Sequence, residues 1–82
     1  MPLLVLSSFE TFDGDRCVDI FERENGTFGF EEFRRDPETR TGWFRGGNFE
    51  RKIFSERGGA LVSARKNVKW LDPVLKRLTE QK

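Results

Sequence analysis

An Asn-Gly pair between two short runs of β-forming residues constrains this chain more than any other feature. Asn25-Gly26 separates residues 17–21 from residues 27–30, and both runs are rich in aromatic and aliphatic side chains. This dipeptide is the strongest short-range signal for a β-hairpin, because both residues tolerate a positive φ. The hairpin restricts the architecture, since every later element must either extend its sheet or cover it.

The register of this hairpin follows from where its apolar side chains point. A two-residue loop sets Glu24 opposite Thr27 and mixes charged and aromatic side chains on both faces. A three-residue loop over residues 24–26, with Gly26 left-handed in a bulge, sets Arg23 opposite Thr27 instead. Four apolar residues then share one face of the hairpin: Val18, Ile20, Phe28 and Phe30. The three-residue loop is therefore the predicted one.

The other face of the predicted hairpin is only half apolar. The register pairs Phe21 with Gly29, an arrangement in which an aromatic ring covers the bare glycine backbone. Cys17 and Phe33 lie on the same face, interspersed with carboxylates. This face needs either partial cover or a partner.

Further strands are expected on both sides of the hairpin. Residues 3–9 indicate a first strand, and residues 43–45 resume the sheet after a polar connection. Gly46-Gly47-Asn48 indicates a turn, and residues 49–54 a further strand. These segments predict an antiparallel sheet of about four to five strands.

Helices are expected at the end of the chain. Ser55 is a plausible N-cap, and the apolar residues that follow recur at helical spacing: Leu61, Ala64, Val68 and Leu71. Asp72 is the predicted N-cap of a second helix, with Pro73 at its first position. Strands followed by helices predict a single α+β domain over residues 1–82, with one or two helices packed on one face of the sheet.

The chain has no histidine and only one cysteine, which limits the catalytic and metal-binding sites that it can form. Histidine is the commonest metal ligand and general base, and one cysteine forms neither an internal disulfide nor a cysteine-based zinc site. Cys17 lies among apolar residues, where we expect a buried and unreactive thiol. The sequence also lacks a phosphate-binding glycine loop and a nucleophile motif. We therefore predict no catalytic residue, no metal and no cofactor, and hence a protein that is not an enzyme.

Two further features of the sequence bear on location. No apolar run approaches the roughly 18 residues of a membrane-spanning helix. Residues 1–6 lack the basic flank and the long apolar region of a signal peptide. The sequence predicts a cytoplasmic protein without a membrane partner.

Charge is unevenly distributed along the chain, although the net charge is only +1. Residues 1–33 contain eight acidic and two basic residues, whereas residues 34–82 contain thirteen basic and six acidic residues. Such an asymmetry either neutralises itself within the fold or attracts an anionic partner. Arginine beside aromatic residues suits base stacking, so Trp43 and Arg45 are the candidates for nucleic-acid contact. Other basic residues lie nearby in the sequence: Arg34, Arg35, Arg40, Arg51 and Lys52.

The leading hypothesis is a binding or assembly module that associates through its sheet with a second copy or with another protein. Its candidate interaction surface consists of Phe21, Phe33, Trp43 and Arg45. Residues 3–6 are apolar at four consecutive positions, whereas a strand buried on one face alternates. A homodimer is therefore predicted. In the alternatives, residues 72–82 fold back over the reverse face of the sheet, or a pocket between sheet and helix binds a regulatory small molecule.

The sequence also resembles a group of small bacterial proteins with no assigned activity. The resemblance is carried by residues 18–37, by Gly42-Trp43-Phe44, and by an Ala- and Arg-rich helix ending in Trp70-Leu71. Residues 26–37 read Gly-Thr-Phe-Gly-Phe-Glu-Glu-Phe-Arg-Arg-Asp-Pro, which is the most distinctive part. The resemblance implies a bacterial cytoplasmic protein and implies no mechanism.

Overall fold

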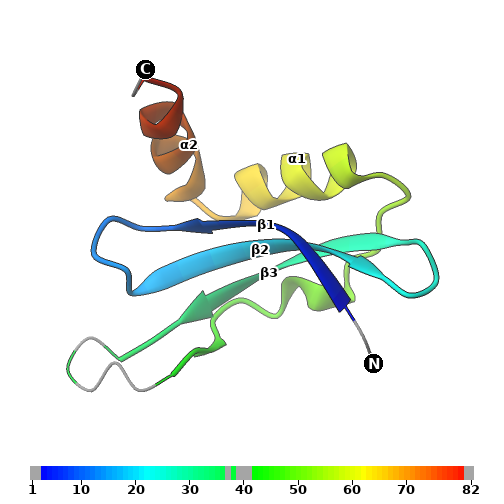
Figure 1. Ribbon diagram of the computed structural model, residues 1–82, viewed down its shortest axis with the longest axis horizontal. Coiled ribbons are helices and arrows are strands. Elements are labelled where there is room, and N and C mark those ends of the chain that lie inside the picture. Colours follow the sequence, from blue (N-terminus) through cyan, green and yellow to red (C-terminus); the bar gives the residue numbers. More distant parts are fainter. Residues whose placement is uncertain (1–2, 37, 39–41, 81–82) are drawn as a thin grey trace.

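The computed structural model describes residues 3–36, 38 and 42–80, and in these residues the chain forms an antiparallel sheet followed by two helices (Figure 1). The strands are β1 (Leu3–Glu10), β2 (Arg16–Arg23), β3 (Phe28–Arg34) and β4 (Phe44–Arg45), and they lie in the sheet in sequence order. A single 3-10 turn, η1 (Phe49–Arg51), precedes the helices α1 (Arg57–Asn67) and α2 (Leu71–Glu80). The predicted α+β class is confirmed.

The β2–β3 hairpin has the predicted register. The backbone N–H of Arg23 donates to the carbonyl oxygen of Thr27 at 2.7 Å, which closes a three-residue loop. Gly26 has a φ of 86°, and its N–H donates to the carbonyl of Arg23 at 2.9 Å. Ile20 consequently lies opposite Phe30, as a core pair must.

The hydrophobic core lies between one face of the sheet and α1. Phe30, Ile20 and Val18 from the hairpin are fully buried, as is Leu71 at the start of α2. Ala60 and Ala64 are completely inaccessible to solvent, and these small side chains let α1 approach β2 and β3 closely. Figure 1 shows α1 and α2 on the same side of the sheet. The predicted contact between the hairpin face and the helical apolar positions is confirmed.

The segment after β4 differs from the prediction. Residues 49–54 were expected to form a strand, and this is wrong: η1 occupies residues 49–51, and only Phe54 pairs with the sheet, through a bridge to Phe28. Asn48 has a φ of 64°, a left-handed conformation that turns the chain away from the strand direction. Phe49 then packs on Phe30, with ring centroids 5.0 Å apart. Phe49 therefore contributes to the core from a 3-10 turn and not from a strand.

The helix starts also differ slightly from the prediction. Glu56, in an extended conformation, is the N-cap of α1, so the assignment of this role to Ser55 is wrong. α2 begins at Leu71, which places Asp72 inside the first turn rather than at the cap. A carboxylate in the first turn still interacts favourably with the helix dipole. α2 packs beside β1 and α1 on the core side, so it does not fold over the reverse face.

We expect the fold to depend strongly on Phe30. The substitution Phe30→Ala should lower the free energy of unfolding by about 3–5 kcal/mol, because it leaves a cavity in a core with no solvent access at this position. The control Phe44→Ala alters a side chain that is 56% exposed and should change stability by about 0.5 kcal/mol or less. Urea denaturation measures both. Similar midpoints for the two variants would show that the core is assigned to the wrong face.

The hairpin turn provides a second test. A Cβ at Gly26 would meet no atom within 4 Å, so the cost of Gly26→Ala is that of a left-handed backbone alone, about 1–2 kcal/mol. Gly58 is equally open but lies in the first turn of α1, where Gly58→Ala should stabilise by about 0.5–1 kcal/mol. Thermal denaturation should therefore move in opposite directions for the two variants. Equal shifts would contradict the turn conformation.

Candidate functional site

The reverse face of the sheet, defined here as the face opposite α1, carries the residues predicted to form an interaction surface. Phe33 and Arg45 are directly opposite each other in β3 and β4. Trp43 precedes β4 and lines, together with Phe33 and Cys17, a cavity of about 200 Å³. Phe21 lies further along β2, opposite Gly29. The structure thus groups Phe33, Trp43 and Arg45, and separates Phe21 from them.

Phe21 offers little surface to a partner, since only 5% of it is exposed. The Arg23 guanidinium lies over its ring, 5.0 Å from the centroid. A Cβ at Gly29 would lie 2.9 Å from the Phe21 ring and 2.7 Å from Arg23 Nη2, so glycine is required there. The predicted covering of Gly29 by an aromatic ring is confirmed, and it explains why this ring is buried.

Trp43 is held by an arginine rather than left free. The Arg35 guanidinium stacks on the Trp43 ring at 4.2 Å and donates through Nε and Nη2 to the carbonyl oxygen of Gly14, at 3.0 and 2.7 Å. These contacts tie the start of β4 to the β1–β2 loop. Trp43 remains 39% exposed.

The surroundings of Trp43 are acidic, which does not favour a phosphate backbone. Glu10 and Asp19 line the same cavity, and Ser8 donates to Asp19 Oδ1 at 2.7 Å. Arg45 forms an ion pair with Glu50. Because Arg35 and Arg45 already have partners and the charged groups that line the cavity are carboxylates, this end of the reverse face is a poor match for nucleic acid. Arg40, which was considered with this group, lies outside the described residues.

Cys17 is a buried thiol on the reverse face. Burial, with smaller contributions from Asp19 and Glu10, raises its pKa to about 12. A thiol with such a pKa stays protonated at neutral pH and is a poor nucleophile and metal ligand. Within the described ranges, no group of three or more His, Cys, Asp or Glu residues is arranged to hold a metal ion.

Two buried carboxylates that the sequence reasoning did not single out are occupied by protein donors. Glu31 accepts the backbone N–H of Phe49 at 3.1 Å and of Glu50 at 3.2 Å. Glu32, on the opposite face, accepts the indole Nε1–H of Trp70 at 2.7 Å. Both roles are structural, because the side chains stabilise η1 and the junction between the helices. No sequence signal identifies these partners, which are 18, 19 and 38 residues away.

The outer edge of β1 is the most apolar exposed surface of the sheet. Leu3, Leu4 and Val5 are 52%, 62% and 51% exposed, although they belong to a regular strand. β1 pairs with β2 on one side only, and a bulge between Val5 and Ser7 makes Leu6 the extra residue. Past the bulge the strand becomes polar, and the Arg57 side chain donates to Ser7 Oγ at 2.7 Å. The open apolar edge is therefore confined to the first half of β1.

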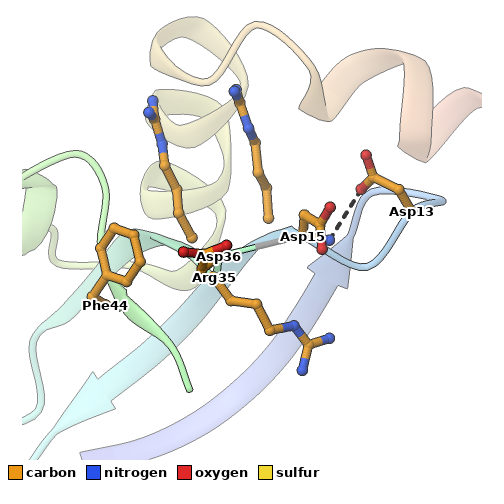
Figure 2. Close-up of a pocket in the computed structure, with 7 residues that line it drawn as sticks. Asp13, Asp15, Arg35, Asp36 and Phe44 are labelled. Carbon is orange, nitrogen blue, oxygen red and sulfur yellow. Dashed lines mark hydrogen bonds between the residues drawn. The ribbon is translucent and has the colours of Figure 1, made fainter. Parts of the chain in front are cut away.

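A second surface lies at the other end of the hairpin, around an open pocket of about 450 Å³ (Figure 2). Charged residues and one aromatic residue line it: Asp13, Asp15, Arg16, Arg34, Arg35, Asp36 and Phe44. Figure 2 shows Phe44 and Asp13 on opposite sides of the pocket, with Arg35 running away from the helices. Hydrogen bonds from the Thr11 hydroxyl and the Asp15 N–H hold the pKa of Asp13 below its usual value. Arg16 and Arg34, which the predicted register already sets opposite each other, were not among the predicted site residues.

Comparisons with protein-family models, with curated proteins and with solved structures found no match for this chain. The resemblance to small bacterial proteins stays a prediction. Among the helices of the described chain, none is long and apolar enough to cross a membrane.

The raised pKa of Cys17 predicts how stability changes with pH. The folded protein keeps a thiol proton that the unfolded chain, with a pKa of 9.0, gives up. The contribution of Cys17 to stability is therefore complete below pH 9.0 and is lost as the pH rises toward about 12. Urea denaturation at about pH 8 and about pH 10 should show a larger loss of stability for the wild type than for Cys17→Ala, which has no thiol to titrate.

A thiol-reactive reagent gives an independent measurement on the same residue. Native protein near pH 8 should react far more slowly than protein unfolded in urea. Equal reaction rates in the two states would contradict the burial of Cys17.

Proposed function

We propose that this protein is a non-enzymatic binding module that assembles as a homodimer through antiparallel pairing of its β1 edges. The observation that carries the proposal is the exposure of three consecutive apolar residues, Leu3, Leu4 and Val5, on an unpaired strand edge. An exposed apolar edge presents backbone donors and acceptors together with a hydrophobic surface, a combination that pairs readily with another strand. The expected bacterial, cytoplasmic setting belongs to the same proposal.

A second copy of the chain suits this edge better than a different partner. Two identical strands in antiparallel pairing are related by a two-fold axis, so one surface supplies both halves of the interface. Pairing centred on Leu4 places Leu3 opposite the partner's Val5, on the same face of the joined sheet, with no charged residue among residues 3–5. Leu3 and Val5 lie on the reverse face, because they are opposite Arg23 and Phe21. The two copies would therefore join one apolar cluster on that face.

The other edge of the sheet is unsuited to the same role. In the described residues β4 contributes two pairs to the sheet, and η1 follows before the isolated bridge at Phe54. An interrupted edge of this kind gives little backbone for a new strand to pair with. Assembly by strand addition is thus directed to β1.

The interface through β1 is small. Three half-exposed aliphatic side chains per copy fall well below the ~800 Å² per partner of a standard stable interface. We therefore expect reversible association with a Kd in the micromolar range or weaker, rather than an obligate dimer. The bulge at Leu6 limits the pairing, because edge bulges twist a strand away from further partners.

Sedimentation velocity over about a hundredfold range of concentration tests the dimer. The wild type should shift from monomer to dimer mass as the concentration rises. Leu4→Lys should remain monomeric, because a charge on the edge opposes pairing while a side chain that is 62% exposed contributes little to folding.

The matched control is Ile53→Lys, which changes a residue that is 69% exposed beside the other edge of the sheet. This variant should dimerise like the wild type. A monomer mass for the wild type at every concentration overturns the proposal. Dimers that persist in Leu4→Lys and dissociate in Ile53→Lys also overturn it, since the interface would then lie at the opposite edge.

A further inference from the structure

Three side chains form a row across the sheet at the end remote from the hairpin turn. Arg16 in β2 is directly opposite Arg34 in β3, and Arg34 is directly opposite Phe44 in β4. Directly opposed residues share a face of the sheet and have Cβ atoms about 4.5–5.5 Å apart. These residues lie two positions along the strands from the Val18–Glu32 pair, on the face that α1 covers further along. We call Arg16, Arg34 and Phe44 the arginine row.

The two arginines of this row form an unfavourable pair in the free protein. Like charges directly opposite each other in a sheet destabilise it. Both side chains are exposed, and in the part of the chain that the structure describes neither makes an ion pair or a side-chain hydrogen bond. The charge of Arg16 also acts on Asp13, where it helps to lower the pKa of that carboxyl. An anion between the two guanidinium groups would relieve this repulsion.

Other charged groups of the pocket are already engaged. Asp13 accepts hydrogen bonds from the Thr11 hydroxyl at 2.6 Å and from the Asp15 N–H at 3.0 Å. Asp36 accepts the N–H of Glu38 at 2.8 Å, and Arg35 donates to Gly14. The guanidinium groups of Arg16 and Arg34 are therefore the donors that the pocket offers to a ligand.

The position of Arg34 is set by the turn after β4. A Cβ at Gly46 would lie 2.9 Å from both Cγ and Nε of Arg34, so the arginine stem runs along the bare backbone of Gly46. The Gly46 N–H in turn donates to the carbonyl of Glu32 at 2.8 Å. Arg34 is thus oriented before any ligand arrives, which reduces the entropy lost on binding.

Phe44 adds an apolar plane beside the two cations. It is 56% exposed, although it belongs to a paired strand. Paired arginines match the geometry of phosphate oxygens, and an exposed aromatic ring stacks on a planar base. The pocket, at about 450 Å³, is within the range of sites for small organic ligands.

We propose that the arginine row binds a nucleotide unit, with its phosphate between Arg16 and Arg34 and its base against Phe44. The unit is either a free nucleotide or one residue of a single-stranded oligonucleotide, since both present the same phosphate and base. The site lies on the opposite face of the sheet from Trp43 and its neighbouring carboxylates, and it is separate from the β1 edge.

Titration calorimetry with adenosine monophosphate and with an oligo-dA of about eight residues tests the proposal and distinguishes the two sources of the ligand. Binding of either probe supports it. Arg16→Gln and Arg34→Gln should each weaken binding at least about tenfold, as the loss of a hydrogen bond to a charged group does. Lys66→Gln is the charge-matched control on the exposed side of α1 and should leave the affinity unchanged.

Two further measurements separate a nucleotide site from a simple anion site. Phe44→Leu should weaken nucleotide binding severalfold and leave the affinity for inorganic phosphate unchanged. The arginine variants should melt at or slightly above the temperature of the wild type, since each removes a like-charge pair. The proposal is overturned if neither probe binds at millimolar concentration, or if binding is unaffected by Arg16→Gln and Arg34→Gln. It is also overturned if inorganic phosphate binds as tightly as the nucleotide and Phe44→Leu changes nothing.

Discussion

The architecture depends on two charged side chains of the hairpin, Arg23 and Glu31. They form hydrogen bonds with backbone groups of residues 49–52, where the chain has left the sheet. Between Arg45 and Phe54 the chain makes no strand pairing with β3, yet its polar backbone groups need partners wherever they are shielded from water. Glu31 accepts two N–H groups at η1, and Arg23 donates to the carbonyl oxygens of Glu50 at 2.5 Å and Lys52 at 3.3 Å. Opposite charges on neighbouring strands thus replace a ladder of backbone hydrogen bonds.

This replacement has consequences on both sides of the sheet. On the core side, η1 brings Phe49 onto Phe30, so the turn adds an aromatic ring that a regular strand would have placed elsewhere. On the reverse side, Arg23 also covers Phe21, which keeps that ring from solvent without a second layer of helices. The same guanidinium therefore holds η1 and closes part of the reverse face. What remains open is the first half of β1, where no comparable side chain lies over the edge in the described structure.

The parts of the fold that could be predicted are those determined by local chemistry. Gly26 permits the left-handed turn, and the alternation of Val18, Ile20 and Phe30 then fixes the register and the core face. The failed prediction of a strand over residues 49–54 has a physical reason. The spacing of the aromatic residues in this segment is compatible both with a strand and with the observed turn followed by an isolated bridge. The left-handed Asn48 and the capture of η1 by Glu31 depend on contacts 18 residues apart, which no local pattern reveals.

The candidate sites differ in the same way: some follow from local sequence chemistry, and others depend on contacts between distant residues. The exposed edge at residues 3–6 could be anticipated, because four consecutive apolar residues do not fit a strand that is buried on one face. The pairing of Arg16 with Arg34 was already implied by the hairpin register. Its significance depended on knowing that neither side chain forms an ion pair with a carboxylate among the described residues. For Trp43 and Arg45, in contrast, the sequence suggested a function that the structure does not favour. Their composition suggested nucleic acid, and only the structure shows that Arg35, Glu50, Glu10 and Asp19 surround them.

The two proposed surfaces lie at opposite ends of β2, which makes them physically separable. Leu3 is opposite Arg23 at the turn end of the strand, whereas Arg16 begins it at the other end. Eight residues at a rise of roughly 3.3 Å place these ends about 23 Å apart. In a dimer centred on Leu4, the two arginine rows would lie on opposite sides of the symmetry axis. A single nucleotide could not contact both rows, so Leu4→Lys should abolish pairing without changing nucleotide affinity, and any coupling between the two would have to pass through the strands themselves.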